Sequence, residues 1–418
     1  MAGVRTVRGR AIEREVAKLA NRRLLFSSDT ERAVARILKD VRTKGDSALQ
    51  RYGKKWDGLA PKQSLRISEE ELANALASIP ANLRHALETA AHNIRKFAEW
   101  QRPQEFTKDI QTGLSVGQII RPIESVGCYV PGGRYPLPSS LLMTVIPAQV
   151  AGVARIVVCS PKPAPETLAA AALLGVTEFY RIGGAQAIAA LAYGTKSIAP
   201  VVKVVGPGNR FVTTAKKLVA FDCAIDMLAG PTEAIVAAEE GDPAFWASDL
   251  VAQAEHDPDT SVVFVTSNAA LAKDVAAELK LRAKTNKIAR TSLSRNAAIF
   301  VTNSPAQSIE VANAIASEHI TLSRDQLASL TSAGSIFLGP YSPQSLGDYA
   351  AGPNHVLPTG GVARYRGGLS VMDYLKIITV QEVSREALVR IAPIVTALAE
   401  AEGLTAHAES VRVRCTRA

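Results

Sequence analysis

The sequence predicts an α/β protein with two parallel-sheet units. Short continuous apolar runs, such as 156–159 and 262–265, alternate along most of the chain with stretches of helical periodicity, which is typical of βαβ units. The pair Gly230-Pro231 separates two successive blocks of this pattern. The length of 418 residues exceeds what one ordinary hydrophobic core accommodates, so we expect two or more domains.

The N-terminal part of the chain is predicted to be mainly helical. Its first residues are rich in arginine but also contain Glu13 and Glu15, which indicates an amphipathic helix and not a transit peptide. From about residue 29 to residue 100, leucine and valine recur at helical spacings among charged residues. His85 and His92 lie in this region, and we interpret both as surface histidines.

The first block opens with a predicted strand at 126–130, followed by a helix that Ser139 or Ser140 is expected to cap. Further strands are predicted at 156–159, 179–182 and 201–205, with helices from 165 and at 186–193. The turn 206–209 then contains Gly-x-Gly, but Phe211 occupies the third glycine position of the dinucleotide fingerprint. The turn therefore fits either the close approach of a phosphate or a tight turn without a ligand.

The second block has predicted strands at 234–237, 262–265, 298–301 and 335–338, and helices at 242–256, 269–281 and 305–317. Asp242 is a suitable N-cap, and Pro243 suits the first helical position. The loop 341–366 is rich in Gly, Pro and Ser, and a loop of this length is usually functional or disordered. Beyond Gly368 we expect helix to the end of the chain, with an amphipathic helix at 385–404.

Composition limits the partners of the protein. No apolar run of about 18 residues predicts a membrane span, and the N-terminus lacks the apolar region of a signal peptide. The net charge of +9 comes from scattered basic residues, with no nucleic-acid-binding motif. The four cysteines, Cys128, Cys159, Cys223 and Cys415, form no close pair, which favours a reducing compartment. We expect a cytoplasmic protein that binds neither nucleic acid nor membranes.

Four polar residues are candidates for a metal site. Gln253 and His256 are three residues apart and share one face of the final turn of a predicted helix. With Asp348 and His407 they would supply nitrogen and oxygen ligands suited to zinc or another divalent ion. Taken alone, a Gln-x-x-His pair is more often a solvated helix end.

A second pair suits proton transfer. Glu318 and His319 stand at the end of the helix predicted at 305–317. An imidazole is the natural acceptor of an alcohol proton near neutral pH, and a carboxylate beside it can serve a second proton transfer. Taken alone, the pair is more often a helix-end ion pair.

Taken together, motifs over nearly the whole chain resemble the histidinol dehydrogenase family. The segments that carry the resemblance are 127–133 (Gly-Cys-Tyr-Val-Pro-Gly-Gly), 183–192 (Gly-Gly-Ala-Gln-Ala-Ile-Ala-Ala-Leu-Ala), 206–209 (Gly-Pro-Gly-Asn), 230–233 (Gly-Pro-Thr-Glu), 253–256 (Gln-Ala-Glu-His), 318–319 (Glu-His), 333–335 (Ala-Gly-Ser), 354–359 (Asn-His-Val-Leu-Pro-Thr) and 401–407 (Ala-Glu-Gly-Leu-Thr-Ala-His).

The resemblance implies an enzyme that oxidises L-histidinol through L-histidinal to L-histidine, at the end of histidine biosynthesis, with reduction of two NAD⁺. It implies one Zn²⁺ per subunit, held by Gln253, His256, Asp348 and His407. Glu318 and His319 match the acid–base pair, and Tyr129, Gln186 and Asn209 match positions that contact NAD⁺. The positions that match substrate contacts are Thr232, Gln253, His256, His319, Asp348, His355, Glu402 and His407.

The resemblance also implies two incomplete Rossmann-like domains with small helical terminal segments. We expect an N-terminal helical segment at 1–27, a first Rossmann-like domain from 28–128 and 232–369, and a second at 129–231. A C-terminal helical tail at 370–418 would reach the partner subunit of a homodimer and complete its active site.

Three alternatives remain at this stage. One is a related NAD-dependent zinc alcohol dehydrogenase that acts on another polar alcohol, such as a sulfonated diol. Departures from the usual family pattern at Thr232, Ser317, Pro353 and Arg366 surround the expected substrate pocket and bear on this alternative. A zinc hydrolase would leave the cofactor positions without a role. A structural metal-binding protein would leave Glu318 and His319 without one.

Overall fold

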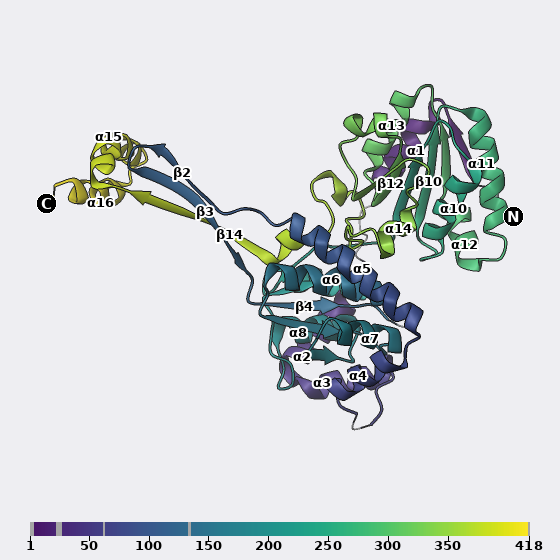
Figure 1. The fold of residues 1–418 in the computed structure, drawn as a ribbon, viewed down its shortest axis with the longest axis horizontal. Coiled ribbons are helices and arrows are strands. Elements are labelled where there is room, and N and C mark those ends of the chain that lie inside the picture. Colours follow the sequence, from purple (N-terminus) through teal and green to yellow (C-terminus); the bar gives the residue numbers. More distant parts are fainter. Residues whose placement is uncertain (1–3, 22–26, 62, 133–134, 417–418) are drawn as a thin grey trace.

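The computed structural model describes residues 4–21, 27–61, 63–132 and 135–416. It has three parts: two parallel-sheet α/β bodies and an arm that projects away from them (Figure 1). The predicted fold class is confirmed, and the arm is an addition to it. Among the described residues, no helix combines the length and apolar character that crossing a bilayer requires.

The first body is built on a six-stranded parallel sheet with strand order β1-β11-β10-β9-β12-β13. Its strands are β1 (Arg5–Arg8), β9 (Glu233–Ala237), β10 (Ser261–Thr266), β11 (Ala298–Val301), β12 (His319–Leu322) and β13 (Ser335–Leu338). Its helices are α1 (Ala11–Ala20), α10 (Pro243–Ala254), α11 (Ala269–Arg282), α12 (Lys287–Asn296), α13 (Pro305–Ile315) and α14 (Gln344–Tyr349), with a 3₁₀ turn at Arg324–Ser329. Apolar clusters cover both faces of the sheet, as burial of a parallel sheet requires.

The second body is built on a five-stranded parallel sheet with strand order β6-β5-β4-β7-β8. Its strands are β4 (Ser125–Tyr129), β5 (Arg155–Cys159), β6 (Glu178–Tyr180), β7 (Lys203–Val205) and β8 (Ala224–Ile225). Its helices are α2 (Ser28–Lys44), α3 (Asp46–Tyr52), α4 (Glu69–Ser78), α5 (Ala81–Trp100), α6 (Pro138–Ala151), α7 (Pro165–Leu173), α8 (Gly184–Tyr193) and α9 (Arg210–Val219). A single π-helical turn, Gly53–Asp57, follows α3.

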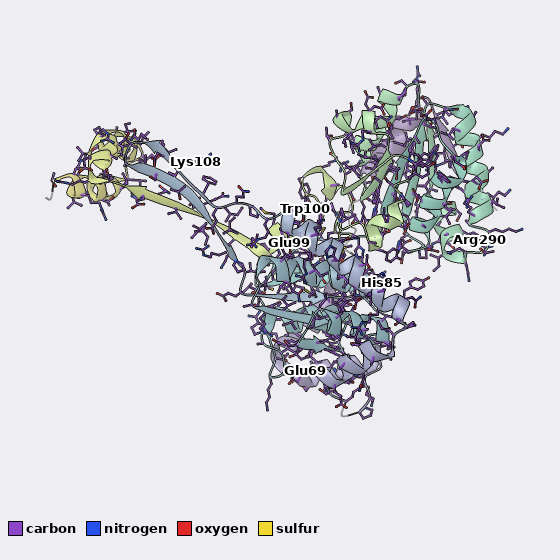
Figure 2. All side chains as sticks on the ribbon, viewed as in Figure 1. Glu69, His85, Glu99, Trp100, Lys108 and Arg290 are labelled. Carbon is purple, nitrogen blue, oxygen red and sulfur yellow. The ribbon has the colours of Figure 1, made fainter. Side chains whose placement is uncertain are left out.

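The arm is an antiparallel sheet with order β14-β3-β2 that ends in two helices. Its elements are β2 (Phe106–Gln111), β3 (Leu114–Pro122), β14 (Leu375–Val383), α15 (Arg385–Ala401) and α16 (Thr405–Thr416). Two 3₁₀ turns, Val362–Arg364 and Val371–Tyr374, precede β14 in the chain. Figure 1 shows α15 and α16 at the far tip of the arm, away from both bodies. Figure 2 labels Trp100 near the base of the arm and Lys108 along it.

Local signals placed many elements correctly. Asp242 caps α10 by accepting from the backbone N–H of Ala244, and Pro243 begins the helix. Gly403 adopts φ +76° just past the end of α15, a position where glycine commonly ends a helix. His85 and His92 are exposed on α5, where Figure 2 labels His85.

Three expectations about larger segments were wrong. The segment 28–102, expected in the first domain, packs on the five-stranded sheet and not on the body that contains 232–369. The reason is that the apolar faces of α2 and α3 join the cluster under α8 and α9. The segment 1–27 contributes a strand, β1, which pairs with β11 and is too short and charged to show a strand pattern. The tail 370–418 was expected to be helical, but it contains the strand β14, which pairs with β3 from Leu375 to Val383.

The helix predicted at 305–317 is also shorter than expected. It ends at Ile315, and Ala316 follows in the left-handed conformation with φ 56°. The chain then turns into β12, which begins at His319 and was not predicted. Glu318 and His319 therefore lie at the start of a strand and not at a helix end.

Candidate active site

The candidate metal and acid–base residues of the first body meet at the amino edge of its sheet. Glu233 begins β9 and His319 begins β12, and these two strands are adjacent and parallel. Helix α10 crosses back against the strand direction, so its last turn brings Gln253 to the same edge. The Nε2 amide of Gln253 donates to Oδ2 of Asp348 on α14 over 3.1 Å. Residues far apart in sequence thus form one polar cluster.

Glu318 and His319 form the buried centre of this cluster. The residues Glu318 and His319 are 7% and 3% exposed. Nε2 of His319 lies 3.6 Å from Oε1 of Glu318 and 4.0 Å from Oδ1 of Asp348. The second carboxylate oxygen of Glu318 accepts from the backbone N–H of Glu233 over 3.2 Å. One oxygen is thereby fixed to the sheet while the other faces the imidazole.

The two carboxylates control the protonation of His319. Burial lowers the pKa of the imidazole, but the neighbouring carboxylate of Glu318, with the charge of Asp348, raises it more, so the net direction is upward. Nδ1 of His319 is buried and has no partner among the described residues. An imidazole stabilised in its protonated form suits a group that accepts a proton from substrate.

His355 connects the cluster to the second body. Its Nδ1 lies 2.7 Å from the backbone carbonyl of Asp348, and its Nε2 lies 3.3 Å from Oγ of the buried Ser140 on α6. Next to it, Asn354 donates to the carbonyl of Met143 over 2.6 Å. Burial lowers the pKa of His355, which favours a neutral imidazole. The predicted polar loop therefore places the candidate site where the two bodies meet.

The predicted ligand set is only partly assembled in one chain. Gln253 and Asp348 are in contact, and His256 follows α10 in an exposed position. His407 lies exposed on α16 at the tip of the arm. Within the described residues, no three histidine, cysteine, aspartate or glutamate side chains gather as a metal-binding group. Amide, imidazole and carboxylate groups are nitrogen and oxygen donors of the kinds that divalent ions bind in proteins.

The predicted substrate contacts divide in the same way. Thr232 is half-buried directly before β9, and its carbonyl accepts from Ser261 over 2.9 Å, which places it beside Glu233 and Glu318. Glu402 and His407 are exposed on the arm. One chain therefore brings together Thr232 and the amino-edge residues, and it leaves the two C-terminal residues apart from them.

The predicted cofactor residues gather at the carboxyl edge of the other sheet. In the order β6-β5-β4-β7-β8, the chain moves outward in one direction from β4 and in the other from β7, so the topological switch point lies between them. Tyr129 ends β4, and the turn at Gly206 follows β7. Dinucleotides bind at such switch points in open parallel sheets. A cavity of about 150 Å³ opens at this edge beside Pro131, Ser160 and Lys162.

A buried ion pair shapes the turn at the switch point. Asp226 accepts from the backbone N–H of Gly206 over 2.7 Å, while Lys216 contacts Asp226 and donates to the Gly206 carbonyl over 3.0 Å. Gly206 has φ +112°, and a Cβ there would lie 2.1 Å from the carbonyl oxygen of Tyr129. Asn209 closes the turn by capping α9. The observed turn is therefore tightly packed against the strand that carries Tyr129.

The sequence did not reveal several residues at these edges, and it suggested Ser140 only as a helix cap, whereas the N-cap of α6 is Leu137. Asp249 lies one helical turn before Gln253, and that spacing could have revealed it. Asp57, Ser140 and Asp226 meet their partners only through contacts between distant segments. Asp57 contacts the Gly183 loop, more than a hundred positions away in sequence.

We expect Asp249→Asn to stabilise the protein above pH 6. Burial raises the pKa of Asp249 from 3.8 to about 6, so the folded protein holds a proton that the unfolded chain releases between these values. The stability associated with this group is complete below pH 4 and is lost as the pH rises through 6. At pH 7 the variant should gain on the order of 1–3 kcal/mol, and at pH 4 almost nothing.

Thermal melts of wild type and variant between pH 4 and pH 8 measure this difference. Asp274→Asn on α11 is a matched control, because Asp274 is an exposed carboxylate. A variant that is no more stable than wild type at pH 7 would contradict the prediction.

The buried carboxylate–imidazole pair suits the proton transfers of an alcohol or aldehyde oxidoreductase, and His355 connects it to the body that carries the dinucleotide-type sheet edge. The model of the family described as histidinol dehydrogenase matches residues 20–415. Histidinol dehydrogenase of Methanothermobacter thermautotrophicus is 44% identical over 419 residues, covering 96% of this chain and 97% of that protein. The enzyme of Bacillus thuringiensis is 45% identical over 402 residues, covering 93% and 94%.

The crystal structure of histidinol dehydrogenase from Elizabethkingia anophelis superposes with a TM-score of 0.94 at 36% identity, covering 98% of each chain. The chain belongs to the histidinol dehydrogenase family, a family of NAD-dependent oxidoreductases. The resemblance found in the motifs is therefore confirmed, and the related dehydrogenase with a different substrate is not favoured.

Proposed function

We propose that the protein oxidises L-histidinol through L-histidinal to L-histidine with reduction of two NAD⁺, at the end of histidine biosynthesis. The observation that carries this proposal is the buried pair of Glu318 and His319, held against Asp348 at the junction of the two bodies. A zinc hydrolase would not need the dinucleotide-type edge, and a structural protein would not need a buried acid–base pair.

The first half-reaction removes a hydride and a proton from the alcohol. The hydride leaves the carbinol carbon for NAD⁺, and His319 accepts the hydroxyl proton, so that the aldehyde and NADH form. In the second half-reaction, Glu318 takes a proton from water as it adds to the aldehyde carbonyl, and His319 returns the proton of the alcohol to the carbonyl oxygen, so that the hydrate forms. The hydrate then loses a hydride to the second NAD⁺ and a proton to His319, which is neutral again, and the carboxylic acid forms.

The polar cluster also supports a metal role. Gln253, His256 and Asp348 would hold Zn²⁺ together with His407 of a second chain, and these ligand types fit zinc. When bound, zinc would supply a positive centre that fixes the imidazole and amine of the substrate. Thr232, His355 and Glu402 are proposed to complete the substrate contacts, with Glu402 facing the amine.

A homodimer with shared sites is part of the proposal. Ile377, Ile394 and Leu398 of the arm are 46%, 61% and 62% exposed, and an apolar surface of this kind on a projecting element is typical of an interface. An isologous dimer would bury these side chains and bring Glu402 and His407 to the partner. The buried free thiols Cys128, Cys159 and Cys223 support the proposed cytoplasmic location.

Removal of the metal is expected to abolish turnover with L-histidinol and to leave the dimer folded, because each body has its own apolar clusters. NADH formation is measured with and without a chelator, and sedimentation reports the dimer. A sulfonated diol is the comparison substrate. Full activity after chelation would refute the zinc assignment, and preference for the diol would refute the substrate.

A further inference from the structure

A buried carboxylate lies under the loop that carries one of the proposed cofactor contacts. Asp57 is 8% exposed and ends the π-helical turn Gly53–Asp57. Its Oδ2 accepts from the backbone N–H of Gly183 and from Nε2 of Gln186, each over 3.1 Å. Single π-helical turns often occur at functional sites, because the extra residue redirects the side chains beside it. Here the turn aims Asp57 at the carboxyl edge of the five-stranded sheet.

The contact decides how the amide of Gln186 is oriented. A carboxylate only accepts hydrogen bonds, so the atom of Gln186 that faces it must be the nitrogen. Oε1 of Gln186 then points the other way, beside Gly184, where an added Cβ would lie 2.9 Å from it. In the described part of the chain, no group donates to this oxygen. Gln186 therefore presents an acceptor at the proposed cofactor site.

The loop that holds Gln186 is fixed on its other sides as well. The backbone N–H of Gly184 donates to the hydroxyl of Tyr129 over 3.1 Å. A Cβ on Gly183 would lie 2.4 Å from the ring of Pro161, so the loop is packed against its neighbour. Burial raises the pKa of Tyr129, which keeps its proton available to an acceptor. The edge thus offers a donor at Tyr129 and an acceptor at Gln186.

We propose that Asp57 is a positioning residue for the dinucleotide. Asp57 holds the amide nitrogen of Gln186, so that Oε1 is left to accept a hydrogen bond from a donor of the cofactor, such as a ribose hydroxyl or an amide N–H. A phosphate oxygen is an acceptor and would not be the partner of Oε1. The inference rests on the proposed NAD⁺ site, because it assigns the polarity of one contact within that site.

The first test measures NAD⁺ affinity by intrinsic fluorescence, together with kcat and the KM for NAD⁺. Asp57→Ala is expected to raise the dissociation constant about 10- to 100-fold, because Gln186 loses its fixed orientation, while kcat at saturating NAD⁺ changes little. Asp57→Asn is expected to restore most of the affinity, since its amide oxygen can accept both hydrogen bonds. Glu71→Gln is the matched control, because Glu71 pairs with Arg181 beside the same loop but does not touch Gln186.

A double-mutant cycle tests whether Asp57 acts through Gln186. Gln186→Met should lose as much affinity as Asp57→Ala, and the double variant should be no worse than either. Deoxy and amide-deleted analogues of NAD⁺ then identify the donor. On wild type, the analogue that lacks this donor should bind more weakly than NAD⁺. On Gln186→Met, the same analogue should bind no more weakly than NAD⁺.

The outcomes separate this inference from the proposed function. If wild type binds no NAD⁺, both fail. If wild type binds NAD⁺ and Asp57→Ala binds it equally well, or if the two single losses multiply in the double variant, the positioning role fails and the proposed function stands. If no analogue distinguishes wild type from Gln186→Met, the assigned polarity fails.

Discussion

An equal mixture of His256→Ala and His407→Ala variants should oxidise L-histidinol, although neither variant alone should do so. His256 lies at the end of α10 in the first body, and His407 lies on α16 at the tip of the arm. If the arm of each chain completes the site of its partner, a heterodimer contains one site with both substitutions and one with neither. With random exchange, about half of the dimers are heterodimers, so about a quarter of all sites should recover.

The experiment measures NADH formation after the variants have been mixed under conditions that allow subunit exchange. Exchange is followed independently with two affinity tags, and each variant mixed with itself is the control. The recovered activity should rise with the fraction of heterodimers. A mixture that stays inactive after proven exchange would mean that His407 serves its own chain.

The second large effect concerns the buried acid–base pair. His319→Asn should lower kcat about 10²- to 10⁴-fold for both L-histidinol and L-histidinal, because asparagine cannot accept the proton that each oxidation releases. Glu318→Gln should spare the alcohol oxidation more than the aldehyde oxidation, because water is activated only in the second. Glutamine can still accept from the backbone N–H of Glu233, so the local structure should be retained.

The pH dependence provides an independent check on Glu318→Gln. Glu318 helps to raise the pKa of His319, so its neutralisation should lower that pKa. The rising limb of the alcohol half-reaction, which needs the neutral imidazole, should then move to lower pH. Equal losses with both substrates in both variants, with an unchanged pH profile, would rule out separate roles for the two residues.

Local features of the sequence were enough to predict most of the secondary structure of this protein and its family. Apolar runs and helical spacings located most strands and helices of both blocks, and Asp242 and Pro243 marked the start of α10. These features depend on side chains close together in the chain, which is why sequence patterns report them. Local motifs also identified the family. The exposed, charged β1 and the strand β12 carried no such pattern.

Only the tertiary structure decided which edge of each sheet carries which residues. The acid–base pair lies at the amino edge of one sheet because β12 pairs with β9. The proposed cofactor residues lie at the carboxyl edge of the other, because β4 and β7 are neighbours there. Such pairings join segments that are distant in sequence, and no local spacing encodes them. The same reason hid the contact of Asp57 with Gln186 and placed His407 on a projecting arm.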